Sequence, residues 1–181
     1  EKLRKNNSVD FDDLLLLPIR LFRENTDILN RYQDRFKYVL VDEYQDTNEA
    51  QYILTKLISS KYRTITCVGD DSQSIYSFRN ADYRNILNFE KDYKSCKVIK
   101  LEQNYRSTKT ILNAANDVIK NNVHKKDKNL WTENETGEKI SYYRSYDEVD
   151  EAFYLIRKIK ELIKNGVSYA DIAILYRTNA Q

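Results

Sequence analysis

The sequence has 181 residues, of which 32% are charged, but 30 Lys and Arg nearly balance 28 Asp and Glu, so composition gives no indication of nucleic-acid binding. Cys67 and Cys96 lie far apart without a Cys-x-x-Cys pair or a histidine cluster, which argues against a metal site of that kind and against a disulfide framework. No apolar run approaches the roughly 18 residues needed to span a bilayer, so we expect a cytoplasmic protein with no membrane partner and with one sizeable core or two small ones.

The first elements in chain order are two helices. Leucines at helical spacing follow an acidic opening over residues 10–25, and either Asp10 or Asp12 is placed to cap this helix. Pro18 predicts a kink or a break within it. A second, shorter helix is predicted over residues 28–36.

A strand, a helix and a second strand follow. Residues 38–41 form a continuous apolar run typical of a buried parallel strand, and residues 64–68 form another. Residues 48–59 between them have helical periodicity. This spacing predicts a βαβ unit, with loops at the carboxyl ends of the strands where ligands bind in open α/β sheets.

The rest of the chain continues in the same alternating manner. Helices and strands are predicted in turn over residues 83–93, 97–101, 108–122, 140–144, 147–165 and 172–176. Gly166 is well placed as the C-cap of the last of these helices. The alternation predicts an α/β fold class.

Two adjacent carboxylates, Asp42 and Glu43, come directly after the first predicted strand. In such a loop one carboxylate can hold Mg²⁺, while the next orients or deprotonates a water molecule. Acids after strands are also frequent as helix caps and loop residues. The pair alone therefore leaves both interpretations open.

Three longer blocks each follow a predicted strand. They are Asp-Glu-Tyr-Gln-Asp-Thr-Asn at 42–48, Gly-Asp-Asp-Ser-Gln-Ser-Ile-Tyr-Ser-Phe-Arg-Asn-Ala-Asp at 69–82 and Leu-Glu-Gln-Asn-Tyr-Arg-Ser at 101–107. In that order they closely resemble motifs II, III and IV of superfamily 1 DNA helicases of the UvrD/PcrA/Rep type. The resemblance extends to residues 9–15 and 174–181, so it covers nearly the whole chain.

The resemblance implies RecA-like parallel sheets of the P-loop NTPase type. Residues 1–100 would be the C-terminal part of the first RecA-like ATPase domain, and residues 101–181 the N-terminal part of the second. None of the glycines, Gly69, Gly137 and Gly166, is followed by lysine, so these residues contain no Gly-x-x-x-x-Gly-Lys phosphate loop. We expect an internal fragment without ATPase activity of its own.

The resemblance also implies roles in ATP hydrolysis. Asp42 would bind Mg²⁺, Glu43 would be the general base for the attacking water, and Gln73 would sense the γ-phosphate and that water. Arg106 would be an arginine finger that stabilises charge in phosphoryl transfer, with Tyr105 stacked on the adenine. Outside this motif, Arg106 would be interpreted as a surface arginine at the start of a helix.

Tyr76 and Phe78 alternate along the second block, so an extended segment would project both rings to one side and Arg79 to the other. The alternation also fits the buried face of a strand. The resemblance implies instead that the rings stack on single-stranded DNA and that Arg79 couples this block to the ATP site. Asn80 stands where the family usually has glycine, but asparagine tolerates left-handed backbone geometry.

The function implied is an ATP-dependent 3′-5′ DNA helicase or translocase with ATP and Mg²⁺ as cofactors. Its partners would be single-stranded DNA, duplex junctions, and repair or replication accessory proteins, with no obligate oligomer. Two alternatives stay open. One is a non-catalytic DNA-binding or interaction module derived from the helicase fold, and the other is an enzyme of the helicase-nuclease type.

Overall fold

The computed structural model describes residues 2–122 and 128–178, which form helices, short 3-10 turns and a two-stranded parallel sheet. This mixture confirms the α/β class at a coarse level. By their internal contacts the residues form two compact units, Glu1–Thr136 and Gly137–Gln181. The predicted boundary near residue 100 separates two RecA-like domains, which is a different division from these compact units. It stays a prediction. Within the described residues, no helix combines the length and apolar character that a bilayer span requires.

The first unit opens with helices α1 (Lys2–Lys5), α2 (Asp13–Glu24) and α3 (Thr26–Arg35). The predicted cap of α2 is confirmed for Asp10, whose Oδ1 accepts a hydrogen bond from Asp13 N–H at 2.8 Å. The Asp12 side chain makes no capping hydrogen bond. The Asp10 carboxylate therefore accepts a hydrogen bond from a backbone N–H at the start of α2 that has no partner within the helix.

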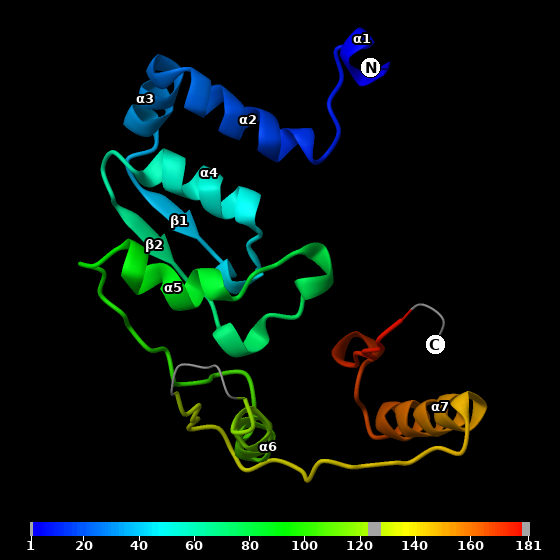
Figure 1. Ribbon diagram of the computed structural model, residues 1–181. Helices are drawn as coiled ribbons and strands as arrows, with labels where there is room; N and C mark the ends of the chain where they lie inside the picture. Colours follow the sequence, from blue (N-terminus) through cyan, green and yellow to red (C-terminus); the bar gives the residue numbers. More distant parts are fainter. Residues whose placement is uncertain (1, 123–127, 179–181) are drawn as a thin grey trace. The chain divides into compact units, whose positions relative to one another are not determined.

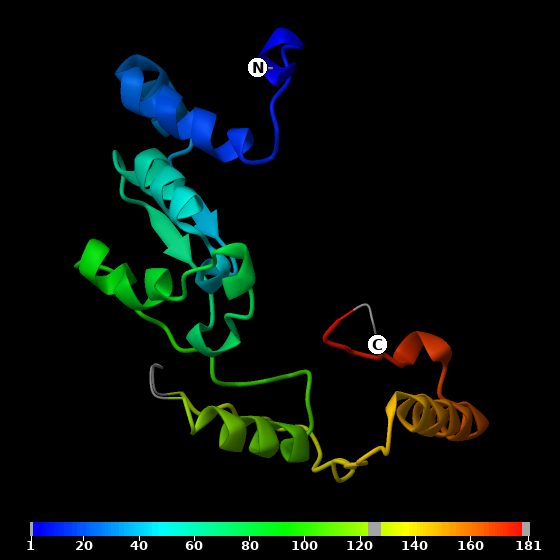
Figure 2. The same ribbon diagram turned by 45° about the vertical axis from the view of Figure 1, so that its right-hand side comes forward.

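Helix α2 continues through Pro18, so the chain has no break there, and the alternative of a kink stays a prediction. Phe22 in α2 is buried, and its ring centroid lies 5.2 Å from that of Tyr32 in α3. Helix α2 also packs against α4 (Glu49–Ser59), and α2 and α3 lie on the side of α4 that faces away from the strands (Figures 1 and 2). This apolar packing holds the helix despite the backbone hydrogen bond that proline cannot donate.

Strands β1 (Val39–Val41) and β2 (Ile65–Cys67) pair in parallel, with Val41 opposite Cys67. Helix α4 connects the two strands and packs on β1, which confirms the predicted strand-helix-strand unit (Figure 1). Because the strands are parallel neighbours, their carboxyl ends lie at the same edge of the sheet. The segments that follow Val41 and Cys67 therefore meet there.

Helix α5 (Arg84–Asp92) packs against the turn that follows β1. Tyr44 in that turn is buried, and its ring meets Phe89 edge-on with 5.7 Å between centroids. Phe89 in turn stacks on Tyr93 at 4.7 Å, and the Tyr93 hydroxyl lies 3.1 Å from Ser59 Oγ of α4. This small aromatic core fixes the turn against both helices.

The prediction of a third strand over residues 97–101 is wrong. These residues carry no strand pairing, and the chain continues into α6 (Lys109–Ile119) after an isolated parallel bridge between Gln103 and Trp131. A strand needs the N–H and C=O groups of a neighbouring strand. Within the described ranges, no strand pairs with these residues.

The second unit contains the long helix α7 (Glu148–Lys164), whose C-cap prediction is confirmed. Gly166 has a left-handed φ of 91°, and its N–H donates to the Ile163 carbonyl at 3.0 Å. The Val167 N–H donates to the Leu162 carbonyl at 3.0 Å. These two bonds form a Schellman motif, for which glycine is the favoured residue.

The strands predicted on either side of α7 are also wrong. Residues 140–144 and 172–176 are described and show no strand pairing, and a 3-10 turn, η4 (Tyr169–Asp171), precedes the second of them. Tyr143 stacks face to face on Tyr154 of α7 with 4.0 Å between ring centroids. Tyr143 thus packs on the helix that follows it instead of pairing in a strand.

Candidate functional site

The segments that leave the two strands carry most of the predicted site residues. They contain the 3-10 turns η1 (Tyr44–Asp46), η2 (Asp71–Gln73) and η3 (Ser77–Arg79). Asp42 and Glu43 lie between β1 and η1, and both are exposed. Glu43 has a left-handed φ of 48°, and its N–H donates to Asp42 Oδ1 at 2.9 Å. Because non-glycine residues seldom adopt this geometry, the sharp turn at Glu43 is a specific feature of the carboxyl edge of the sheet.

Gln45 connects this turn to the segment after β2. Its side chain is buried, and its Nε2 donates to Glu43 Oε2 at 2.7 Å. Its Oε1 accepts the Asp70 N–H at 2.9 Å. A Cβ atom at Gly69 would overlap Gln45 Oε1, so the close approach of the two segments requires glycine at this position.

Asp70 extends the same network to the predicted phosphate sensor. Its Oδ2 accepts a hydrogen bond from Gln73 Nε2 at 2.8 Å, and its Oδ1 accepts the Ser72 N–H at 2.9 Å. Lys128, from the chain beyond α6, forms an ion pair with the same carboxylate. Glu43 and Gln73 are therefore joined through Gln45 and Asp70 by successive hydrogen bonds.

The charge on Asp70 is stabilised by its surroundings. Partial burial would by itself raise the pKa of this carboxyl group, because burial disfavours the charged form. Hydrogen bonds from Lys128, Gln73 and the Ser72 N–H outweigh burial and hold the pKa of Asp70 below its ordinary value. The carboxylate is thus a fixed negative centre around which the turn is organised.

Tyr105 and Arg106 lie in a tightly held turn with exposed side chains. Asn104 Oδ1 accepts the N–H groups of Arg106 at 2.9 Å and of Ser107 at 2.8 Å. Asn134 Nδ2 donates to the carbonyls of Tyr105 at 3.2 Å and of Ser107 at 3.1 Å. The backbone of this turn is fixed, whereas no contact within the described residues joins Arg106 to the carboxylates that follow β1.

Tyr76, Phe78 and Arg79 form an exposed cluster that differs from the predicted extended segment. The chain turns through η3, and the two ring centroids lie 5.9 Å apart. The Arg79 guanidinium carbon lies 5.2 Å from the Tyr76 centroid and 5.4 Å from the Phe78 centroid. The prediction that Arg79 points away from the rings is therefore wrong, because the 3-10 turn brings all three side chains together. With Phe78 69% exposed, the buried-strand alternative is also wrong.

Asn80 adopts the backbone geometry expected where the family usually has glycine. Its φ is 62°, in the left-handed region, and its N–H donates to the Ser77 carbonyl at 3.0 Å. Asparagine is among the residues that best tolerate this conformation. The turn after η3 is thus compatible with the substitution.

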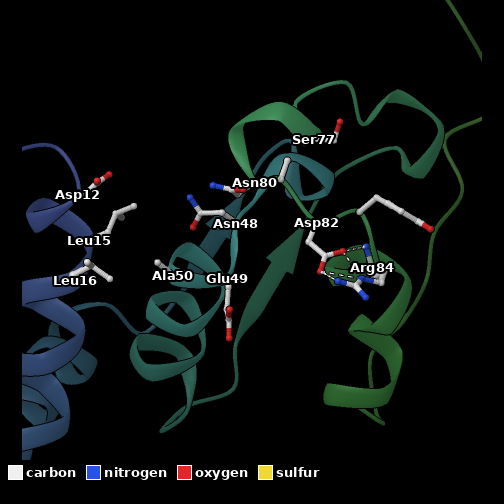
Figure 3. A pocket seen from close by; sticks show the side chains of 12 residues that line it. Asp12, Leu15, Leu16, Asn48, Glu49, Ala50, Ser77, Asn80, Asp82 and Arg84 are labelled. Atoms are coloured by element: carbon white, nitrogen blue, oxygen red, sulfur yellow. Dashed lines mark hydrogen bonds and ion pairs between the residues drawn. The ribbon is translucent and has the colours of Figure 1, made fainter.

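A hollow of about 850 Å³ lies between the start of α2, the start of α4 and the segment after η3 (Figure 3). Leu15, Asn48 and Asn80 are among its lining residues. At its rim the Arg84 guanidinium contacts the Asp82 carboxylate at 2.7 Å. None of the predicted site residues lines this hollow, so it is separate from the turn that carries the carboxylates.

The residues that sequence reasoning missed are those that hold the others in place. Gln45, Gly69, Asn104, Asn134 and Lys128 were not singled out as site residues. Gln45, Gly69 and Asn104 lie inside the three blocks at 42–48, 69–82 and 101–107. An amide or a glycine among the acidic residues of such a block could have identified them as residues that hold the site together. Asn134 and Lys128 lie far along the chain, and no local pattern identifies their partners.

The comparisons with known proteins agree with these blocks. Residues 1–94 match the UvrD/REP helicase N-terminal domain, and residues 99–181 match the UvrD-like helicase C-terminal domain. The ATP-dependent DNA helicase PcrA of Staphylococcus aureus (strain Mu50) is 57% identical over 180 residues, which are 99% of this chain and 25% of that protein. The protein of the same name from Staphylococcus epidermidis (strain ATCC 12228) is 53% identical over 180 residues, with the same coverage. The chain thus spans about a quarter of the length of these curated relatives.

Proposed function

The chain belongs to the UvrD/REP helicase family, and we propose that it is part of the motor of an ATP-dependent DNA helicase or translocase. Residues 1–100 would complete a first RecA-like domain and residues 101–181 would begin a second. The observation that carries the proposal is the hydrogen-bonded connection of Glu43 to Gln73 through Gln45 and Asp70. This network joins the Glu43 carboxylate, which would activate water, to the Gln73 amide, which would sense the phosphate.

Asp42 fits the role of a Mg²⁺ ligand. Magnesium commonly binds through one or two carboxylates and completes its shell with phosphate oxygens and water, so a larger protein cluster is not needed. Within the described residues, no group of three or more His, Cys, Asp or Glu forms a metal site, but Asp42 is exposed after β1. Asp46 Oδ1 in the next turn is buried and has no hydrogen-bond partner among the described residues, so this oxygen lacks a donor or a cation. When bound, Mg²⁺ would neutralise charge on the transferred phosphate.

Glu43 would orient the attacking water and accept its proton. Gln45 holds one carboxylate oxygen, Oε2, while Oε1 makes no hydrogen bond within the described part of the chain. That oxygen is available to a water molecule at the carboxyl edge of the sheet. A general base needs a fixed position within hydrogen-bond reach of the proton that it removes.

Gln73 and Arg106 would respond to the nucleotide. The Gln73 amide donates one N–H to Asp70, so its second N–H would donate to a γ-phosphate oxygen and its carbonyl oxygen would accept from the attacking water. Arg106 lies exposed on a fixed turn, as an arginine that reaches a phosphate from another domain must be. Tyr105 beside it would stack on the adenine.

The cluster of Tyr76, Phe78 and Arg79 would contact single-stranded DNA. Exposed aromatic rings are sequence-tolerant platforms for bases, and an arginine beside them adds charge toward the backbone. Movement in the 3′ to 5′ direction is part of the proposal and rests on the family resemblance alone. The non-catalytic alternative is less favoured, because a protein that only binds DNA has no need for the positioned Glu43.

The test is ATP hydrolysis by the complete protein that contains these residues, with and without single-stranded DNA. We expect hydrolysis that rises several-fold as single-stranded DNA is titrated in. DNA binding without any ATP turnover would contradict the proposal and favour the non-catalytic module.

A further inference from the structure

Gln45 has the most deeply buried amide side chain among the described residues of the first unit, with 1% of its surface exposed. Both ends of its amide are used. Nε2 donates to Glu43 Oε2 at 2.7 Å and lies 3.5 Å from Asp46 Oδ2, while Oε1 accepts the Asp70 N–H at 2.9 Å. The buried amide therefore connects the segment that follows β1 to the segment that follows β2.

Only a carboxamide satisfies these contacts in this orientation. Rotating the amide by half a turn would place its oxygen against the carboxylates of Glu43 and Asp46, and its NH₂ group against the Asp70 N–H. The backbone is fixed as well, because Ser74 Oγ donates to the Gln45 carbonyl at 3.2 Å. A glutamate at this position would keep the acceptor for Asp70 but lose the donor to Glu43.

We propose that Gln45 is a positioning residue for ATP hydrolysis, which holds the Glu43 carboxylate and the Asp70–Gln73 turn in a fixed relative position. It does not touch the substrate and acts through Glu43 and Gln73. Without this connection, the Glu43 carboxylate would lose the hydrogen bond that fixes its position relative to the Asp70–Gln73 turn. The inference rests on the proposed function, since it assigns a task within that reaction.

Gln33 provides a matched control within the same unit. It is also a buried glutamine, 4% exposed, and its Nε2 donates to the Leu57 carbonyl at 2.7 Å and to Ser60 Oγ at 2.8 Å. These contacts tie α3 to the end of α4 and involve no site residue. Loss of this amide should therefore affect folding stability without affecting catalysis.

The experiment compares Gln45→Met, Gln45→Glu and Gln33→Met in the complete protein with saturating single-stranded DNA. Thermal unfolding establishes that each variant is folded, and kcat and KM for ATP are then measured separately. We expect both Gln45 variants to lose about tenfold or more in kcat, because a small displacement of a reacting group is costly. The KM for ATP should stay within about twofold, because Gln45 does not contact the nucleotide. Gln33→Met should keep the wild-type kcat.

If Gln45→Met fails to fold, Gln45→Glu tests the positioning role, because glutamate keeps the size of the side chain and the acceptor for the Asp70 N–H. A folded Gln45→Glu variant with kcat within about twofold of the wild type would overturn the positioning role. An equal loss of kcat in Gln33→Met would overturn it too, since any buried glutamine would then have the same effect. A wild-type protein without ATP turnover would instead overturn the proposed function itself, and the positioning role with it.

Discussion

Asp70 and Lys128 form an ion pair that joins the turn after β2 to the chain beyond α6. Both side chains are about one-fifth exposed, so the pair is partly shielded from water. We expect Lys128→Met to lower the free energy of unfolding by about 1–3 kcal/mol, because it leaves a partly buried carboxylate without its cation. Urea unfolding measures this loss. Lys120→Met is the control, since Lys120 pairs with Asp117 on the surface and should change stability by less than about 0.5 kcal/mol.

The stabilisation from Lys128 should depend on pH in one direction. The pKa of Asp70 lies below its ordinary value of 3.8 in the folded protein, so folding favours the charged carboxylate. The stabilisation from such a carboxyl group is fully present above its pKa in the unfolded chain. It is lost as the pH falls through the pKa of the group in the folded protein. We expect the difference in unfolding free energy between wild type and Lys128→Met to be constant from about pH 8 to 5 and to shrink below about pH 4. An undiminished difference at the lowest pH would contradict the assignment.

Phe78→Ala should weaken single-stranded DNA binding by the complete protein by about 1–3 kcal/mol, because the exposed ring offers a stacking surface. Fluorescence anisotropy with a labelled oligonucleotide measures the affinity. The control is Phe11→Ala, which removes a still more exposed phenylalanine ring outside the cluster of Tyr76, Phe78 and Arg79. Equal losses of affinity in the two variants would argue against a specific stacking role.

Gly69→Ala should destabilise the first unit by about 1–3 kcal/mol, because the added Cβ would overlap Gln45 Oε1 and crowd Ile86 Cδ1. Gly166→Ala tests a different cost, since its Cβ would meet nothing within 4 Å but would occupy a φ of 91°. That variant should lose about 1 kcal/mol from backbone strain alone. Thermal unfolding compares the two, and ATP turnover should fall only in Gly69→Ala.

The helices were predictable because each carries its own signal in the sequence. Periodic apolar residues identified α4 and α7, and Gly166 marked the end of α7 by its freedom at positive φ. The strands at 97–101, 140–144 and 172–176 were not formed as predicted, because β-prone residues become a strand only where a neighbouring strand supplies hydrogen bonds. The β-propensity of a segment does not indicate whether a neighbouring strand is present to pair with it.

The site was predictable in its residue types but not in its connections. Consecutive acids after an apolar run placed Asp42 and Glu43 at the end of β1 from sequence alone. The bond from Gln45 to Asp70 depends on the parallel pairing of β1 with β2, which brings residues 25 positions apart into contact. The arrangement of Arg79 over the Tyr76 ring depends on the 3-10 turn at η3, which alternation did not predict.

The most direct test of the central claim is ATP binding and hydrolysis by the complete protein, wild type beside Glu43→Gln, with single-stranded DNA titrated in. The account predicts that DNA stimulates hydrolysis in the wild type, and that Glu43→Gln binds ATP nearly as well but hydrolyses it slower by about two orders of magnitude or more. Unchanged turnover in the variant would contradict the assignment of Glu43 as the group that activates water.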